Sequence, residues 1–389
     1  MSQAGGRNEV GAVRLQAAVI YHFWPHYREP VMQAMDRDGS ITYHFVGSGE
    51  ALEGVLHADP KAVSRFVEAP FRKLGALLWQ PGAVRAATDR RYQALILLAD
   101  PHFLSTWVAA LIGKLRRVPV VFWGHGWLKA EGSRRGLLRR VFFRLSDRLL
   151  VYGERGRALG IAAGFPAERI GVVFNSLDVA HADRLIAALR NGQIAPRRPQ
   201  DFFADPERPL LICTARLTAK CRFDLLFQAA ASLAQQGRPV NVLLIGDGPE
   251  RAALEGLARH LRIAAHFYGA CHLEDVVGPM IYHADLTVSP GKIGLTAMHS
   301  LMYGTPAITH GDFDAQMPEV EAITPGVTGA FFRRDDAADL ARVIAEWLQT
   351  APPRDVIRKA ARATIAANWT PEGQARIIGE TVQALVGHA

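Results

Sequence analysis

The chain has 389 residues, of which 49% are hydrophobic and 21% charged, and its formal net charge is +8. This length exceeds what one hydrophobic core normally organises, and the composition excludes a disordered or fibrous protein, so we expect a two-domain globular protein. The positive charge favours anionic partners such as nucleotide phosphates, anionic lipid or nucleic acid, although any basic proteome would produce the same charge.

The cysteines Cys213, Cys221 and Cys271 fit no disulfide framework and lack the CxxC spacing of a zinc site. We therefore expect a reducing, cytosolic compartment and no structural metal. The polar residues 1–16 lack the charged-then-apolar pattern of a secretory signal. The apolar stretch 102–115 is shorter than the about 20 residues that span a bilayer, and it predicts a helix packed on a sheet.

The first half of the chain alternates apolar runs with amphipathic helical patterns. The runs predict buried parallel strands at 16–21, 41–46, 94–99, 118–124, 148–153 and 170–175. Helical patterns lie between most of them, for example at 28–37, 81–91 and 134–147. Residues 47–79 are poorly patterned and are assigned only loosely. Repeated strand–helix alternation predicts a parallel sheet covered by helices on both faces.

A segment rich in Pro, Arg and Asp then interrupts the alternation and predicts an interdomain linker over 191–208. Beyond it, strands are expected at 210–215, 240–246, 265–269, 284–290 and 306–310, and helices at 223–236, 249–261, 273–284, 295–303, 337–350, 356–368 and 371–387. We predict an α/β protein with an N-terminal domain over 1–190, completed by the C-terminal helix 371–389, and a C-terminal domain over 209–370. A ligand cleft is expected between the domains, at the carboxyl ends of the strands.

The segment 289–312 contains a strand, a glycine-bearing turn from Gly291 to Gly294, a helix and a second short strand. At the start of the helix, Gly294, Leu295 and Thr296 offer main-chain N–H groups and one hydroxyl. Such donors, together with the helix dipole, favour an anion, and a phosphate is the obvious candidate. The same pattern also fits an ordinary turn without a ligand.

Five segments of the second half, in order, are ARLTAKCRFDLLFQA, VLLIGDGPERAALEGLA, HFYGACHLEDVVGPMIYHADLTVSPG, GLTAMHSLMYGTPAI and PEVEAITPGVTGAFF. Together they resemble the retaining nucleotide-sugar glycosyltransferases of the family 4-like class, also called group 1. The resemblance covers most of 210–348, while the first half matches only diffusely. It implies a GT-B fold, in which two doubly wound Rossmann-like domains face a central cleft.

In that family an arginine and a lysine, five residues apart, bind the donor diphosphate. Arg216 occupies the arginine position, and a guanidinium suits phosphate oxygens. The lysine position holds Cys221, so Lys220 or Arg222 would reach the phosphate instead, although Lys220 equally fits a solvated cation where a helix starts. The resemblance also places GDGPE, with its glycines Gly246 and Gly248, near the nucleotide, whereas the aspartate between them is more simply a helix cap.

The family also carries two glutamates with seven residues between them, and these positions hold Gly291 and His299 here. The second glutamate accepts hydrogen bonds from the ribose in the family. His299 would do so through a neutral ring nitrogen, or it packs as a core histidine. Gly291 does not replace the first glutamate, which lies near the donor sugar, while Lys292 would supply a cation beside the diphosphate. The loss of both glutamates puts the donor's identity in question.

His125 in WGHGW follows a predicted strand end, where family members often place a histidine against the donor sugar. The alternative is a turn residue that stabilises its own loop. His26, Tyr27 and Arg28 follow the first strand, and they either touch the acceptor or a phosphate or form the entry to a helix.

Glu319 and Glu321 lie in a loop that faces the cleft in relatives. Glu319 aligns with the PE pair of the family, where it either contacts the donor or is structural.

We therefore predict a glycosyltransferase that moves a sugar from a nucleotide-diphosphate donor to an acceptor hydroxyl. The expected catalytic residues are His125, Arg216, Lys220 and Lys292. The expected donor-binding residues are Arg222, Gly246, Gly248, Gly291, Gly294, Leu295, Thr296, His299 and Glu319, and the acceptor-side candidates are His26, Tyr27 and Arg28. The resemblance implies retention, metal independence and no cofactor. It also implies a glycan or lipid-linked glycan acceptor, in bacterial polysaccharide or glycolipid assembly. The basic segment 133–148 either lies on an anionic membrane, at the inner face of the plasma membrane, or packs on the sheet.

Three other functions remain open from the sequence. A sugar-nucleotide epimerase on the same fold would need carboxylates near the sugar, and the missing glutamates count against it. A catalytically inactive nucleotide-sugar-binding relative is the second. The third, nucleic-acid binding, rests on charge alone without a recognisable module, so no nucleic-acid partner is expected.

Overall fold

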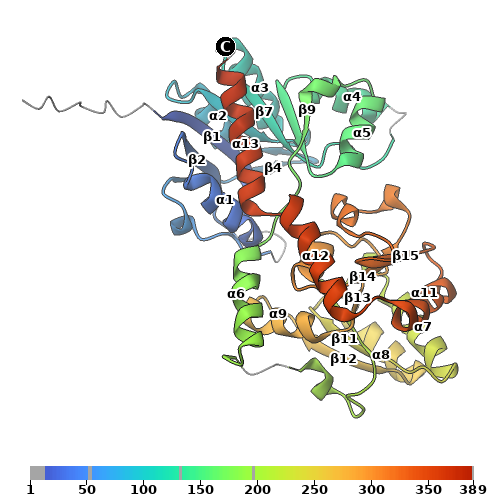
Figure 1. The fold of residues 1–389 in the computed structure, drawn as a ribbon. Helices are drawn as coiled ribbons and strands as arrows, with labels where there is room; N and C mark the ends of the chain where they lie inside the picture. The colour runs from blue at the N-terminus through green and yellow to red at the C-terminus, as the bar shows by residue number, and fades with distance from the viewer. Residues whose placement is uncertain (1–13, 51–54, 131–133, 195–197, 388–389) are drawn as a thin grey trace, which may run out of the picture. The chain divides into compact units, whose positions relative to one another are not determined.

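The computed structural model describes residues 14–50, 55–130, 134–194 and 198–387 (Figure 1). Its α-helices are α1 Glu29–Asp36, α2 Pro81–Thr88, α3 Leu104–Leu115, α4 Arg134–Phe143, α5 Glu154–Ala162, α6 Val179–Arg190, α7 Phe223–Gln235, α8 Arg251–Leu261, α9 Glu274–His283, α10 Leu295–Met302, α11 Ala337–Thr350, α12 Arg354–Asn368 and α13 Pro371–Val386. Residues 1–13, 131–133, 195–197 and 388–389 lie outside the described part of the chain. Predictions that fall on them concern the N-terminal stretch, the start of the basic segment, the linker and the end of the terminal helix.

The first sheet has the strand order β3-β2-β1-β6-β7-β8-β9. Its strands are β1 Leu15–Phe23, β2 Ile41–Ser48, β3 Phe66–Glu68, β6 Ala94–Leu98, β7 Val120–Gly124, β8 Arg148–Val151 and β9 Ile170–Val172. β1 pairs in parallel with both β2 and β6, so the chain reverses its direction of winding between these strands. The six strands predicted in this half are confirmed. The loosely assigned region adds β3 and the hairpin of β4 Arg72–Leu74 and β5 Leu77–Trp79.

The second sheet has the order β12-β11-β10-β13-β14-β15. Its strands are β10 Leu210–Thr214, β11 Asn241–Ile245, β12 Ala264–Gly269, β13 Leu286–Val288, β14 Ala307–His310 and β15 Gly329–Phe332. All its pairings are parallel. The winding reverses between β10 and β13, so the loops after these two strands lie at the topological switch point, where open α/β sheets bind ligands.

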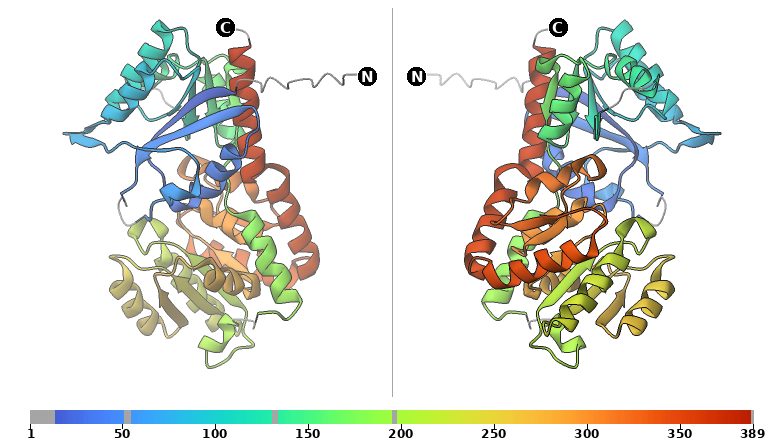
Figure 2. Two further views of the ribbon diagram at one scale, coloured as in Figure 1. Left: turned by 90° about the vertical axis from the view of Figure 1, so that its left-hand side faces the viewer. Right: turned by 90° about the vertical axis from the view of Figure 1, so that its right-hand side faces the viewer.

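Alternate residues of the central strands in the second sheet face two separate hydrophobic layers. In β10, Leu211 and Cys213 pack among side chains of α7, α8 and α11, whereas Leu210 and Ile212 pack among those of α6, α9, α10 and α12. On the first of these faces α7 and α11 pack against each other (Figure 2). A sheet with both faces covered requires the near-continuous apolar strands seen in the sequence. The expected doubly wound α/β architecture is therefore confirmed.

Besides β3, β4 and β5, three further elements of the described chain were not predicted. β15 is only four residues of Gly, Ala and Phe, without the β-branched residues that mark a strand. α5 buries Gly156 and Gly160 but no large apolar side chain, so it lacks an apolar stripe. α6 buries Ala182, Leu185 and Ile186, and it begins at a side-chain cap in which Asp178 accepts the His181 N–H.

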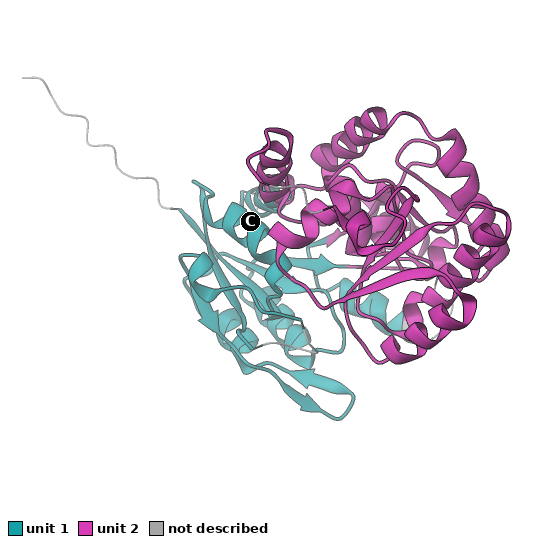
Figure 3. Ribbon diagram, turned by 90° about the horizontal axis from the view of Figure 1, so that it is seen from below, with its two compact units in different colours: residues 1–124, 137–149, 375–389 teal, residues 125–136, 150–374 magenta. Residues whose placement is uncertain are grey.

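The chain divides into two compact units, coloured separately in Figure 3. One comprises Met1–Gly124, Leu137–Leu149 and Ala375–Ala389, and the other His125–Gly136 and Leu150–Gln374. The boundaries expected at 190 and 209 stay predictions. No helix in the described part of the chain combines the length and the apolar character that crossing a bilayer would require.

Candidate functional site

Glycines let the loops after β10 and β11 approach each other closely. A Cβ atom on Gly246, whose φ is +148°, would lie 1.9 Å from the Ala215 carbonyl oxygen, and one on Gly248 would lie 2.3 Å from the Leu217 carbonyl oxygen. Hydrogen bonds between the two loops, such as Leu217 N–H to the Asp247 carbonyl at 3.0 Å, use this closeness. Gly246 and Gly248, predicted as donor-binding residues, thus hold the loop that carries Arg216.

Gly291 has the same role in the loop after β13. A Cβ atom there would lie 2.0 Å from the Lys220 carbonyl oxygen, and the Gly291 N–H donates to the Cys221 carbonyl at 3.1 Å. The chain itself therefore occupies the space that a side chain at position 291 would need. A glutamate at this position would therefore collide with the chain, and the loops after β10 and β13 are fixed to each other.

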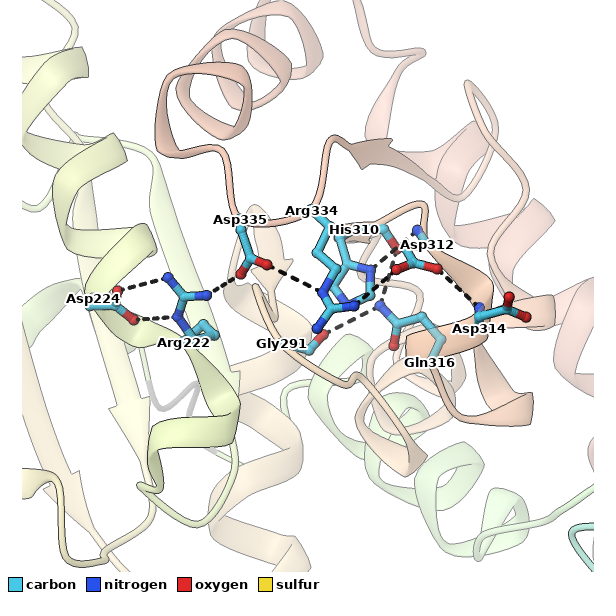
Figure 4. A network of polar contacts seen from close by, with 9 residues as sticks. All are labelled: Arg222, Asp224, Gly291, His310, Asp312, Asp314, Gln316, Arg334 and Asp335. Atoms are coloured by element: carbon cyan, nitrogen blue, oxygen red, sulfur yellow. Dashed lines mark hydrogen bonds and ion pairs between the residues drawn. The ribbon is translucent and has the colours of Figure 1, made fainter. Parts of the chain in front are cut away.

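Gln316 fastens the Gly291–Ile293 segment from its other side (Figure 4). This side chain is only 2% exposed. Its Oε1 accepts the Ile293 N–H at 3.0 Å, while Nε2 lies 2.8 Å from Thr309 Oγ1 and 3.3 Å from the Gly291 carbonyl oxygen. A fully bonded buried amide is costly to disturb, so this loop is held in one conformation.

A row of ion pairs passes beside this loop in Figure 4. It joins Asp224, Arg222, Asp335, Arg334 and Asp312 in turn. A hydrogen bond from Arg222 to Asp224 raises the pKa of the Arg222 guanidinium, with Asp335 adding to the effect. Arg222 was one of two candidates for the missing lysine. Because its guanidinium is already shared by two carboxylates, Lys220 is the better candidate.

Three candidate cations are exposed around the switch point: Arg216 and Lys220 after β10, and Lys292 after β13. Their placement follows from the glycine contacts, which put both loops at the same edge of the sheet. The loops that carry these cations therefore contact each other, and the roles of the three side chains in donor binding stay predictions. Together the three cations give this edge of the sheet a positive potential suited to a polyanion.

The start of α10 offers fewer free donors than expected. The Thr296 hydroxyl donates to the Thr214 carbonyl at 3.1 Å, and the Thr296 N–H to the Ile293 carbonyl at 3.2 Å. The expectation that this hydroxyl would serve a phosphate is therefore wrong, because its one proton is used within the fold. Within the described ranges, no acceptor is recorded for the N–H groups of Gly294 and Leu295, which remain available to an anion.

His299, at the position of the second glutamate, is bonded within the protein. Its Nε2 lies 3.0 Å from Glu274 Oε1 and its Nδ1 lies 3.5 Å from Thr214 Oγ1. Tyr303, the residue that follows α10, donates to the same Glu274 oxygen at 2.6 Å. Both ring nitrogens are thus committed, which leaves His299 no free nitrogen to accept from a ribose.

Glu274 was not identified from the sequence. It is the first residue of α9, where an acidic residue is ordinary because of the helix dipole. Burial on its own would raise the pKa of Glu274, but His299 and Tyr303 reverse this effect and hold the pKa at about 2. The carboxylate is consequently ionised at neutral pH. No signal in LEDVV distinguishes such a residue from a helix cap.

His125 lies immediately after β7, as the sequence predicted, and it is exposed. Its ring packs edge-on against Tyr152, with ring centroids 5.0 Å apart. The next residue, Gly126, has a φ of +64°, so the turn needs a glycine there. Loop stabilisation and ligand contact are both compatible with this placement.

The three acceptor-side candidates differ in how deeply they are buried. His26, Tyr27 and Arg28 form a 3-10 turn that leads into α1. Arg28 is 7% exposed, and its guanidinium lies over the rings of Tyr21 and Trp123, at 5.4 and 4.8 Å from their centroids. A role for Arg28 in contacting an acceptor is not supported, because its cation–π contacts are part of the core.

Glu319 and Glu321 lie in a 3-10 turn, Pro318–Ala322. Glu319 is 2% exposed and accepts a hydrogen bond from Asn175 at 2.8 Å. Glu321 accepts the N–H groups of Glu154 and Arg155 at 2.8 and 3.0 Å, so it caps α5. Burial raises the pKa of Glu321, and these two hydrogen bonds oppose the rise. Both side chains have structural partners.

Helix α4 does not bury all its apolar residues. Phe142 and Phe143 are buried as expected, but Leu137, Leu138 and Val141 are 56%, 57% and 48% exposed. At 100° per residue, this second group lies on the same outward side as the exposed Arg140 and Arg144. The expectation that the leucines pack on the sheet is therefore wrong.

Known proteins resemble the second half most clearly. Residues 196–364 match the family model of glycosyl transferases group 1. The resemblance to this family is thus confirmed for that part of the chain, which contains Arg216, Lys220, Lys292 and α10. In the described ranges, no group of three or more His, Cys, Asp or Glu side chains could hold a metal ion.

One relative is the GDP-mannose-dependent alpha-(1-6)-phosphatidylinositol dimannoside mannosyltransferase of Mycobacterium tuberculosis, with 33% identity over 114 residues. The match spans 28% of this chain and 29% of the relative, so it covers less than a third of that protein.

Solved structures resemble the chain over nearly its whole length. HepE of Anabaena in complex with UDP has a TM-score of 0.70 at 16% identity, covering 96% of this chain and all of that one. The UDP-GlcNAc 2-epimerase of Neisseria meningitidis has a TM-score of 0.63 at 13% identity, covering 95% of this chain and all of that one. The GT-B fold is thereby confirmed, and since an epimerase structure is among those that share it, the fold alone does not assign the reaction.

Proposed function

We propose that the protein is a glycosyltransferase that moves a sugar from a nucleotide-diphosphate donor to an acceptor hydroxyl, with retention and without a metal ion. The observation that supports this most directly is the set of exposed cations at the switch point of the second sheet. Arg216, Lys220 and Lys292 lie on loops that glycine contacts hold together, beside the free N–H groups at the start of α10. A diphosphate is the ligand whose charge matches this arrangement.

The proposed chemistry places charge where these groups lie. The bond between the sugar's anomeric carbon and the diphosphate oxygen breaks, and its electron pair leaves with the diphosphate. The acceptor hydroxyl oxygen forms the new bond to that carbon and gives up its proton, which an oxygen of the leaving diphosphate accepts. Arg216, Lys220, Lys292 and the N–H groups of Gly294 and Leu295 would stabilise the leaving diphosphate, which gains charge in the transition state. His125 remains the candidate for contact with the donor sugar.

A thermal-shift panel of UDP, GDP, ADP and their sugar conjugates tests the donor site. A ligand that binds the folded state stabilises it by about 2.7 kcal/mol at a hundredfold excess over its Kd. We expect one base to stand out, with the shift lost in Arg216→Ala and kept in the matched surface variant Arg259→Ala of α8. A folded protein that shifts with no nucleotide would refute the proposal.

One observation favours a second candidate, a nucleotide-sugar-binding protein without turnover. Both positions of the family's paired glutamates are occupied by residues with structural contacts, Gly291 and His299. Release of nucleoside diphosphate from the donor, measured with and without added acceptors, distinguishes a transferase from a binding protein without turnover. Tight binding with no turnover under any acceptor would support the inactive relative.

The proposal extends to the acceptor and to location. We assign a glycan or lipid-linked glycan acceptor, in bacterial polysaccharide or glycolipid assembly, at the cytoplasmic face of the plasma membrane. The outward face of α4 supports this proposal, because it combines exposed Leu137, Leu138 and Val141 with Arg140, and the exposed Arg144 follows directly after the helix. Apolar side chains flanked by arginines suit the interface of an anionic membrane.

A further inference from the structure

Glu274 carries an ionised carboxylate that hydrogen bonds connect to the end of β10, and the proposed function gives it no role. It lies at the start of α9 and its side chain is 30% exposed, compared with 18% for its partner His299. Two bonds connect it to the switch point: Glu274 Oε1 to His299 Nε2, and His299 Nδ1 to Thr214 Oγ1. Thr214 is the last residue of β10, and its carbonyl accepts the hydroxyl of Thr296 at the start of α10.

The hydrogen bonds of the Glu274 carboxylate involve only one of its two oxygens among the described residues. His299 and Tyr303 both bond to Oε1, and within the described residues no partner is recorded for Oε2. An ionised carboxylate has only acceptor positions, so Oε2 can take donors from a ligand. His299 and Tyr303 act as positioning residues, because they orient the carboxylate without using its second oxygen.

We propose that Glu274 accepts hydrogen bonds from the ribose hydroxyls of the nucleotide donor, which rests on the proposed function. A carboxylate would repel the diphosphate, so in a nucleotide it must face a group that donates hydrogen bonds and carries no negative charge. A vicinal diol offers two such donors, and acidic residues bind ribose hydroxyls in this way at other α/β nucleotide sites. His299 occupies the position of the family's second glutamate. It bonds to the carboxylate of Glu274, which belongs to another helix, α9.

The experiment measures calorimetric Kd values of UDP, GDP and ADP, of their 2′-deoxy forms, and of inorganic pyrophosphate. We expect the wild-type protein to prefer the ribose form of its diphosphate over the 2′-deoxy form by about 10- to 100-fold, as for hydrogen bonds to a charged group. In Glu274→Gln the preference should fall to within about twofold, because the ribose form loses affinity while the 2′-deoxy form does not. The amide oxygen can still accept from His299 and Tyr303, so the fold should persist.

Two further variants make the result specific. Asp275→Asn alters the adjacent carboxylate, which bonds to His181 at 2.8 Å, and it should keep the preference. Glu274→Asp withdraws the carboxylate by one methylene and should lose most of the preference even if Glu274→Gln does not fold.

The outcomes separate this inference from the function on which it rests. If the ribose preference survives in Glu274→Gln and Glu274→Asp, or if the wild-type protein shows none, the assignment of Glu274 is wrong although the donor site stands. If Glu274→Gln weakens the ribose and 2′-deoxy forms equally, the carboxylate contacts the base instead, which also overturns it. If the wild-type protein binds no nucleotide at all, the proposed function itself fails.

Discussion

At the scale of single residues, the packing around Gly291 determines whether a glutamate can be accommodated there. Because the Lys220 carbonyl oxygen would lie 2.0 Å from a Cβ there, Gly291→Glu should not recreate the family's glutamate. We expect this variant to be destabilised by about 1–3 kcal/mol, as overpacked sites are, and to bind diphosphates no better than wild type. Urea unfolding and calorimetry test this. Gly256→Glu on α8, where a Cβ meets nothing within 4 Å, is the control and should be at least as stable as wild type, because glutamate favours a helix more than glycine does.

The pKa of Glu274 gives a second prediction at this scale. The folded-state pKa is about 2, below the ordinary value of 4.5, so the ionised group stabilises the fold above pH 4.5 and this contribution is lost as the pH falls towards 2. The shift corresponds to on the order of 3 kcal/mol. Between pH 5 and pH 2 the unfolding free energy of wild type should therefore fall more steeply than that of Glu274→Gln. Parallel pH profiles from urea titrations would show that the carboxylate carries no such stabilisation.

At the scale of elements, the loop between β10 and α7 depends on the glycines of its neighbour. Gly246→Ala should cost about 1–3 kcal/mol, since φ is +148° and the Cβ would meet the Ala215 carbonyl. It should also displace Arg216 and weaken diphosphate binding. Gly256→Ala, inside α8 with open space around it, should gain about 0.5–1 kcal/mol. Thermal unfolding and binding of both variants test the pair, and equal stability of the two would contradict the close contact.

The elements also show what the sequence could predict. Strands such as β10 and β11 were predicted within a residue or two, because their continuous apolar runs are required by helices on both faces. Arg216 and the glycine loops were chosen from the resemblance to short motifs of the glycosyltransferase family, and their roles in donor binding stay predictions. Glu274 was not identified, because its partner His299 lies 25 residues away and the bond depends on how α9 packs beside α10. The Thr296 hydroxyl was misassigned for the same reason, since its acceptor belongs to β10.

At the scale of the whole molecule, the proposed membrane contact predicts a lipid-dependent distribution. The double variant Leu137→Ser/Val141→Ser and the double variant Arg140→Gln/Arg144→Gln should each reduce binding to anionic phosphatidylglycerol vesicles. Each arginine near the surface contributes about 1 kcal/mol, so the second variant should weaken binding by about tenfold or more. Co-sedimentation at low and high salt measures this. Val356→Ser, which alters a 55% exposed valine on α12, should bind as wild type does.

If vesicle binding is unchanged in both α4 variants, or if neutral vesicles bind equally well, this helix is not the membrane contact. Nucleotide binding should be unaffected in either variant, because the mutated side chains belong to the compact unit that does not contain Arg216.

The cysteine at the family's lysine position has one more consequence. The Cys221 sulfur lies 3.2 Å from the carbonyl oxygen of Arg216 and is partly accessible, whereas burial raises the pKa of the Cys213 thiol and keeps it unreactive. In a Cys271→Ser background, a thiol-reactive fluorophore should therefore label the loop after β10 selectively. A ligand at the diphosphate position should slow the labelling of Cys221. The labelling rate, followed in real time, would therefore allow donors to be screened without a radioactive donor or a known acceptor.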